Sequence, residues 1–112
     1  MTKHTIFFGE AQRMDKVENE TVDLIVTSPP YPMIEMWDEI LFNQNNEIRT
    51  EFENGNFENA FELMHQELDK VWNECFRVLK KGGIACVNIG DATRTLNKNF
   101  RLFASHSRII QG

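Results

Sequence analysis

The feature that most constrains this chain is an apolar run that ends abruptly at two prolines. Residues 22–27 are almost entirely apolar or β-branched, and they are followed by Ser28-Pro29-Pro30-Tyr31. A continuous apolar run of this length is typical of a parallel strand that is covered on both faces. Proline has no backbone N–H to donate to a sheet, so the strand must give way to a rigid turn. The run therefore predicts an α/β fold with this turn at the carboxyl end of a buried strand.

Other segments predict the rest of a parallel sheet and the helices beside it. Residues 5–8 and 84–89 are short β-branched or aromatic runs that predict strands, and residues 14–17 predict a short helix. Between residues 57 and 79, apolar side chains recur at steps of three and four, which predicts one long amphipathic helix. This order of elements indicates an α/β chain with a parallel sheet, flanking helices and right-handed crossovers.

The end of the long helix and the segment before it carry their own signals. Residues 80–81, both lysine, are expected in the last helical turn, at the negative end of the helix dipole. The glycines at 82–83 are expected to form the left-handed stop after it. Residues 32–56 are rich in asparagine, mixed with isolated aromatic residues. A short helix around residues 35–42 is compatible with this composition, but the segment as a whole is expected to be a loop or lid.

Size and composition exclude several classes of protein. A chain of 112 residues fits one small domain, covering residues 1–112. No apolar stretch reaches the roughly 18 to 20 residues that a membrane span needs, so a cytoplasmic location without membrane contact is expected. The two cysteines and three histidines have no metal-ligand spacing, so no metal is expected. Cys75 and Cys86 are expected to be small buried thiols.

The distribution of charge bears on nucleic-acid binding. The net charge of -5 argues against a chain that coats DNA by itself, because nonspecific DNA affinity comes mainly from Lys and Arg. Residues 89–112 have the opposite balance, with Asp91 as the single acidic residue. Their basic residues are Arg94, Lys98, Arg101 and Arg108. If any part of the chain faces phosphate, this tail is expected to do so.

The strand and turn at residues 22–31 resemble the catalytic motif of the amino-group DNA methyltransferases, in which Asp, Asn or Ser precedes Pro-Pro and an aromatic residue. The resemblance implies S-adenosylmethionine as methyl donor, double-stranded DNA as substrate and a partial Rossmann-like fold. The Ser28 hydroxyl and the Pro29 carbonyl would accept hydrogen bonds from the exocyclic amino group, on a loop stiffened by Pro30. Tyr31 would stack on the flipped base. For the tetrapeptide alone, a rigid turn that ends a strand is an equal alternative.

Two flanking segments extend the resemblance to the cofactor. Residues 8–11 are similar to the family's Gly-Asp segment, whose carboxylate helps hold adenosine. Gly9 matches the glycine of that segment, and Glu10 stands where Asp is usual. A solvated turn carboxylate is an equal alternative for Glu10. Asp91 is a candidate for contact with cofactor or base, and a helix cap or turn is its alternative role. Because ligands gather at the carboxyl ends of parallel strands, these residues and the turn at 28–31 are expected to line one cleft.

The resemblance also indicates what is missing. Ser28 favours the cytosine-N(4) subclass of these site-specific, restriction-modification enzymes, and adenine is the closest alternative. The chain resembles the first half of a permuted, catalytic-motif-first enzyme, and it contains neither a Phe-x-Gly-x-Gly loop nor room for a target-recognition region. A fragment of an enzyme is therefore expected: either a truncated reading frame, or one part of a split enzyme whose second chain supplies the cofactor loop and the recognition region. The alternatives are a non-catalytic remnant or interaction module, and a protein-glutamine methyltransferase, against which Ser28 in place of Asn argues.

Overall fold

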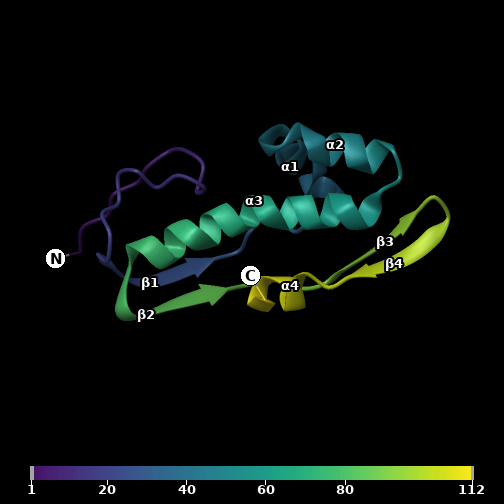
Figure 1. Cartoon of the computed structure of the whole chain (residues 1–112). Helices are drawn as coiled ribbons and strands as arrows, with labels where there is room; N and C mark the ends of the chain where they lie inside the picture. The colour runs from purple at the N-terminus through teal and green to yellow at the C-terminus, as the bar shows by residue number, and fades with distance from the viewer. Residues whose placement is uncertain (1, 112) are drawn as a thin grey trace.

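A computed structural model describes residues 2–111 as a mixed α/β structure with a small parallel sheet and flanking helices. In chain order the elements are β1 (Val22–Thr27), the 3-10 helix η1 (Glu35–Trp37), α1 (Asp38–Gln44), α2 (Asn46–Glu53), α3 (Phe57–Val78), β2 (Leu79–Val87), β3 (Ala92–Leu96), β4 (Asn99–Phe103) and α4 (Ser105–Gln111). Helix α3 runs along one side of β1 and β2, and α1 and α2 lie over its other end (Figure 1). Within residues 2–111, no helix combines the length and the apolar character needed to cross a bilayer.

The parallel pairing of β1 with β2 confirms two of the three expected strands. The register runs from Leu24 opposite Ile84 to Thr27 opposite Val87, with an irregularity just before Leu24. The glycines belong to this irregularity: Gly82 has a φ of 79°, and a Cβ on Gly83 would lie 2.9 Å from the backbone oxygen of residue 80. The long helix therefore ends at Val78, and the expectation that residues 80–83 form its last turn and stop is wrong. Those residues instead bring β2 alongside β1.

Residues 2–20 form an arm without regular structure, so the strand expected at residues 5–8 and the helix expected at 14–17 are both absent. A four-residue run cannot form a sheet without a neighbouring strand, and the arm has none. Arg77 near the end of α3 anchors the arm by donating to the carbonyls of Met14 and Val17, both at 2.8 Å. Arg77 also donates to the Glu74 carboxylate, and this hydrogen bond is the largest cause that lowers the pKa of Glu74 to about 2. The arm is thus fixed where β1 begins.

The segment at residues 32–56 is helical, and the expectation of a loop or lid there is wrong. It contains η1, α1 and α2, which agrees with the short helix considered around residues 35–42. The asparagines that suggested a loop mark the ends of helices: the Asn45 side chain accepts from the backbone N–H of Glu47 at 3.0 Å, as an N-cap does. Leu41 and Ile48 are fully buried, so the segment supplies core.

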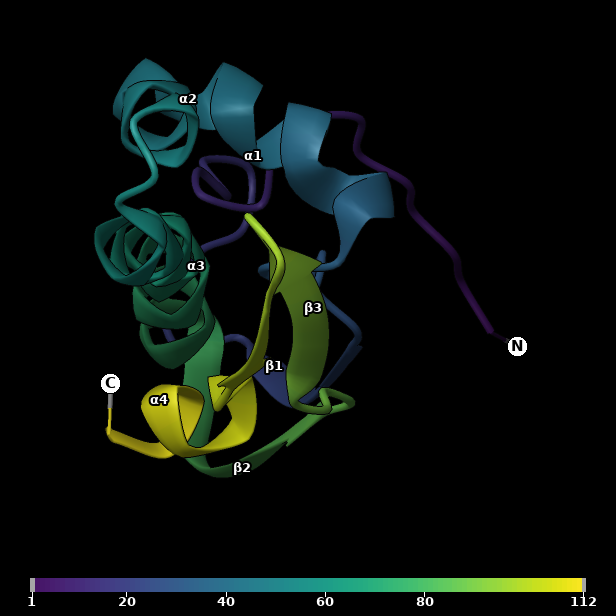
Figure 2. The same ribbon diagram turned by 90° about the vertical axis from the view of Figure 1, so that its right-hand side faces the viewer.

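The hydrophobic core lies among α1, α2, α3 and the antiparallel β3–β4 hairpin (Figure 2), toward the end of the molecule opposite to the amino-terminal arm (Figure 1). Its buried members are Met33, Leu41, Phe42, Ile48, Phe57, Ala60, Met64, Ala92, Leu96 and Phe103. None of them comes from β1 or β2. The parallel pair therefore sits at the margin of the core, held by α3 on one side.

A buried polar contact joins α3 to α4. The Nε2 atom of His65 lies 3.1 Å from the Oγ atom of Ser105, and both side chains are fully buried. Burial disfavours the charged imidazolium, and the nearby Arg108 guanidinium adds to this, so the pKa of His65 falls to about 4. The neutral ring is the form that the fold holds.

We predict that this contact makes the chain sensitive to mild acid. The unfolded chain protonates His65 near pH 6.5 and the folded chain only near pH 4, so stability from this group is present above pH 6.5 and falls between these values. The expected loss is about 2–3 kcal/mol. Urea unfolding of wild type and His65→Gln from pH 7 to pH 4 measures this loss. If the free energy of unfolding depended equally on pH in the two proteins, His65 would not be the group responsible.

Candidate active site

The Ser28-Pro29-Pro30-Tyr31 turn follows directly from the carboxyl end of β1, as the sequence predicts. The backbone N–H of Asn88 donates to the carbonyl of Thr27 at 2.9 Å, which continues the strand pairing past the end of β2. The Tyr31 hydroxyl donates to the Asn88 carbonyl at 3.4 Å. The turn is thus tied to the residues that follow the neighbouring strand.

The chain after the turn anchors it from the other side. The carbonyl of Tyr31 accepts from the N–H of Ile34 at 3.2 Å, closing a tight turn in which Met33 has a φ of 68°. Pro32 and Met33 are almost completely buried, so this turn cannot swing away from the core without exposing them. A rigid backbone at this position reduces the entropy that is lost when a ligand is bound.

Within this rigid turn, the side chains differ in how far they reach solvent. Ser28 is exposed and makes no side-chain hydrogen bond within residues 2–111, whereas Pro29 is buried. Tyr31 is half-buried, and its ring edge would lie 4.0 Å from a Cβ placed on Gly90. An exposed hydroxyl can accept a hydrogen bond from a ligand, and a partly exposed aromatic ring can stack on a planar one.

The two carboxylates assigned to the cofactor lie in different places. Asp91 follows β2 and is exposed, and its Oδ1 accepts from the backbone N–H of His106 at 2.9 Å, at the start of α4. Glu10 and Gly9 lie in the arm, beside a hollow lined only by residues 7–17. The expected single cleft therefore forms only in part. Residues 28–31 meet residues 88–90, but residues 9–10 do not join them.

Two further residues support this site and were not singled out from the sequence. The backbone carbonyl of Asn88 accepts the hydrogen bond from the Tyr31 hydroxyl. In the sequence, this role is indicated only by the position of Asn88, one residue past β2. Asp38 begins α1 and is bound by Arg94 of β3, with N–O distances of 2.9 and 3.0 Å. Burial raises the pKa of Asp38, and Arg94 opposes this rise. The pair ties the helix that follows residues 28–31 to the hairpin.

The three arginines of the basic tail are paired with carboxylates of the described residues, so they do not form a free positive surface there. That this tail is the part that would face phosphate stays a prediction. Arg94 is bound to Asp38, and Arg101 lies 3.4 Å from Glu58. Arg108 is bound to two carboxylates of α3, those of Glu62 at 2.9 Å and Asp69 at 2.8 Å. Lys98, at the tip of the hairpin, is exposed. The arginines serve the fold.

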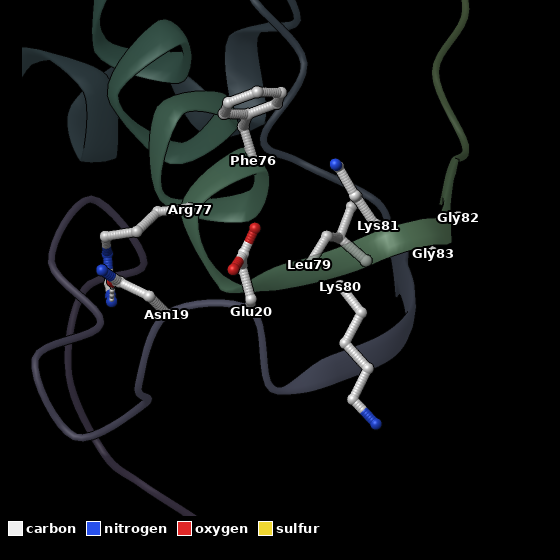
Figure 3. A pocket seen from close by; sticks show the side chains of 9 residues that line it. All are labelled: Asn19, Glu20, Phe76, Arg77, Leu79, Lys80, Lys81, Gly82 and Gly83. Atoms are coloured by element: carbon white, nitrogen blue, oxygen red, sulfur yellow. Dashed lines mark hydrogen bonds between the residues drawn. The ribbon is translucent and has the colours of Figure 1, made fainter.

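A separate open hollow lies at the opposite, amino end of the parallel pair (Figure 3). It is lined by Asn19, Glu20, Phe76, Arg77, Leu79, Lys80, Lys81, Gly82 and Gly83. Lys80 and Lys81 leave β2 in opposite directions there (Figure 3). None of residues 28–31 lines this hollow, so it lies apart from the candidate site.

Among residues 2–111, no three His, Cys, Asp or Glu side chains are grouped as ligands for a metal ion.

Comparison with known proteins gives one family. The family model described as DNA methylase, N6_N4_Mtase, matches residues 22–110, which include β1, the turn and the hairpin. The chain belongs to this amino-group DNA methylase family. No solved structure gives a significant match.

Two curated relatives support the assignment. The chain is 54% identical over 121 aligned residues to the Type II methyltransferase M.MjaI of Methanocaldococcus jannaschii, a match that covers 98% of this chain. It is 42% identical over 110 residues to the Type II methyltransferase M.MthZI of Methanothermobacter thermautotrophicus, covering 97% of this chain. The matches span only 40% and 31% of these relatives, so the chain corresponds to less than half of each.

The Asp38–Arg94 pair gives a prediction for the support of the site. Arg94→Met leaves a buried carboxylate without its partner, so a destabilisation of about 3 kcal/mol at pH 7 is expected. The loss of Arg94 raises the pKa of Asp38 further, so the penalty should shrink as acid protonates this carboxyl. Urea unfolding at pH 7 and pH 5 measures both effects. Arg49→Met, which breaks an exposed pair with Glu39, is the matched control and should cost about 0–1 kcal/mol at either pH.

Proposed function

We propose that the chain is the catalytic-motif part of a site-specific DNA methyltransferase that acts on the exocyclic N4 amino group of cytosine in double-stranded DNA. The observation that carries the proposal is the turn after β1, in which Ser28 is exposed and the Tyr31 hydroxyl is bound to the backbone after the neighbouring strand. Membership of the DNA methylase family supports the same reading. S-adenosylmethionine would supply the electrophilic methyl group.

The chemistry assigned to the turn follows from the target amine. The lone pair of an exocyclic amino nitrogen is delocalised into its ring, which makes the nitrogen a weak nucleophile. Hydrogen bonds from the amino group to the Ser28 hydroxyl and the Pro29 carbonyl would concentrate electron density on the nitrogen. A duplex hides this atom, so the base must be flipped out, and Tyr31 would stack on the flipped ring. Pro30 would hold these groups in place.

The remaining assignments complete this proposal. The parallel pair would form the middle of a larger Rossmann-like sheet, whose other strands come from the part that the longer relatives possess. Asp91, with one carboxylate oxygen free, would contact the methyl donor. Gly9 and Glu10 would reach the donor's adenosine only after the arm is brought to the carboxyl end of the sheet. A second chain or chain segment would supply the cofactor loop and the basic surface for DNA.

A chimera tests the proposed role of Ser28. In this chimera the chain replaces the matched segment of the M. jannaschii relative, so the catalytic turn acts within a full-length protein. Ser28→Ala removes one acceptor for the amino group, and the methylation rate should fall on the order of 10²-fold. Incorporation of labelled methyl groups into DNA measures the rate.

The control and the contrary result are equally specific. Ser107→Ala, at an exposed position of α4, should retain the full rate. Calorimetric titration with S-adenosylmethionine should give the same affinity for Ser28→Ala and for the unaltered chimera, because Ser28 is assigned to the base. An unchanged methylation rate in Ser28→Ala would contradict the proposal.

A further inference from the structure

One face of the parallel pair is apolar and uncovered. Leu24 pairs with Ile84 and Val26 pairs with Cys86, and alternate residues of paired strands point to the same face. These four side chains form what we call the open face. Leu24 is 55% exposed, Val26 73% and Ile84 60%, and Cys86 is also exposed. The expectation that both cysteines are buried is therefore wrong for Cys86, although Cys75 is buried.

The opposite face of the same strands is treated differently by the fold. Ile25 and Thr27, which alternate with the open-face residues, are half-buried, and α3 runs along one side of the pair (Figure 1). Parallel strands in folded domains are covered on both faces, because their crossover segments lie on each side. Two parallel strands with one bare apolar face are an incomplete layer.

The amino-terminal arm carries a second unpartnered apolar feature. Its run at residues 5–8 has the composition of a strand, but Ile6 is 77% exposed and Phe8 is 94% exposed. Within residues 2–111, β1 and β2 each have one unpaired edge. Among the described residues, the open face, one edge of each parallel strand and the apolar run at residues 5–8 are thus all uncovered.

We infer that the open face is the docking surface for the polypeptide that the longer relatives possess outside the matched segment. This inference rests on the proposed function. We infer this occupant because the matched segment is only 40% and 31% of those relatives. Most of each relative therefore lies outside the matched segment and must pack against some surface. The occupant is expected to present a helix or helices with an apolar stripe, the layer that covers the free face of a parallel sheet.

Cys86 reports on this surface without any substitution. Its exposed thiol belongs to the open face, opposite Val26, so alkylation by iodoacetamide should be rapid in the isolated chain. In the chimera with the M. jannaschii relative, the rate at Cys86 should fall by about tenfold or more, the factor that each 1.4 kcal/mol of protection gives. Mass spectrometry of the peptide that contains Cys86 separates it from other thiols.

One variant is a control and a second perturbs the open face. As the control, Asn59→Cys places a thiol at an exposed position in the first turn of α3, away from β1 and β2, and this thiol should react equally fast in both proteins. Val26→Lys puts a charge on the open face, which should lower the melting temperature of the chimera more than that of the isolated chain. Because Val26 is exposed, the isolated chain should tolerate the substitution.

The outcomes separate this inference from the proposed function. Protection of Cys86 in a chimera that does not methylate DNA would support the docking surface and contradict the proposed activity. An active chimera in which Cys86 stays reactive would overturn the docking surface alone. Protection in the isolated chain that grows with its concentration would also overturn it, because the occupant would then be a second copy of the chain.

Discussion

The parallel pairing of β1 with β2 determines where the candidate site forms. It places the turn after Thr27 next to the residues after Val87, and the Asn88 backbone joins the two segments. The pairing is possible because α3 ends at Val78 and the chain bends through the glycines at 82–83. A side chain at Gly83 would collide with backbone atoms, so glycine is required for the close approach of β2 to β1.

Charge in this chain is used mainly inside the fold. The hairpin arginines and Arg108 bind carboxylates of α1 and α3, and these contacts hold the hairpin and α4 against the core. A chain with net charge -5 whose arginines are largely engaged has little to offer the phosphates of DNA. The separation is consistent with a division of labour in which this part positions the base and another part binds the duplex.

The sequence predicted the elements whose signals are local. The apolar run of β1, the prolines that end it and the periodic stripe of α3 each follow from a local rule, and all three appear where expected. The expectation that β1 is covered on both faces is wrong, because Leu24 and Val26 are exposed. The helices at residues 32–56 were missed because asparagine favours both loops and helix ends, and only burial of residues such as Leu41 separates the two. The glycines at 82–83 were likewise assigned to a helix stop, since a strand bulge needs the same conformation.

At the candidate site, the sequence located the turn but not its surroundings. The Ser28 turn was placed by its motif, whereas Asn88 acts through its backbone and gives no side-chain signal. The expected gathering of Glu10 at the same edge depended on a strand at residues 5–8, and that strand needs a neighbour that the described residues do not provide. Pairing between distant segments is the part of a fold that local patterns determine least.

We propose that the turn after β1 directs a methyl group to the exocyclic amino nitrogen of cytosine. The most direct test is the identity of the modified nucleoside in DNA treated with the full-length chimera and S-adenosylmethionine, measured by nuclease digestion and mass spectrometry. We expect N4-methylcytosine. N6-methyladenine would keep the amino-group chemistry but contradict the assigned base, and 5-methylcytosine, or methylation of protein without DNA, would contradict the proposed function.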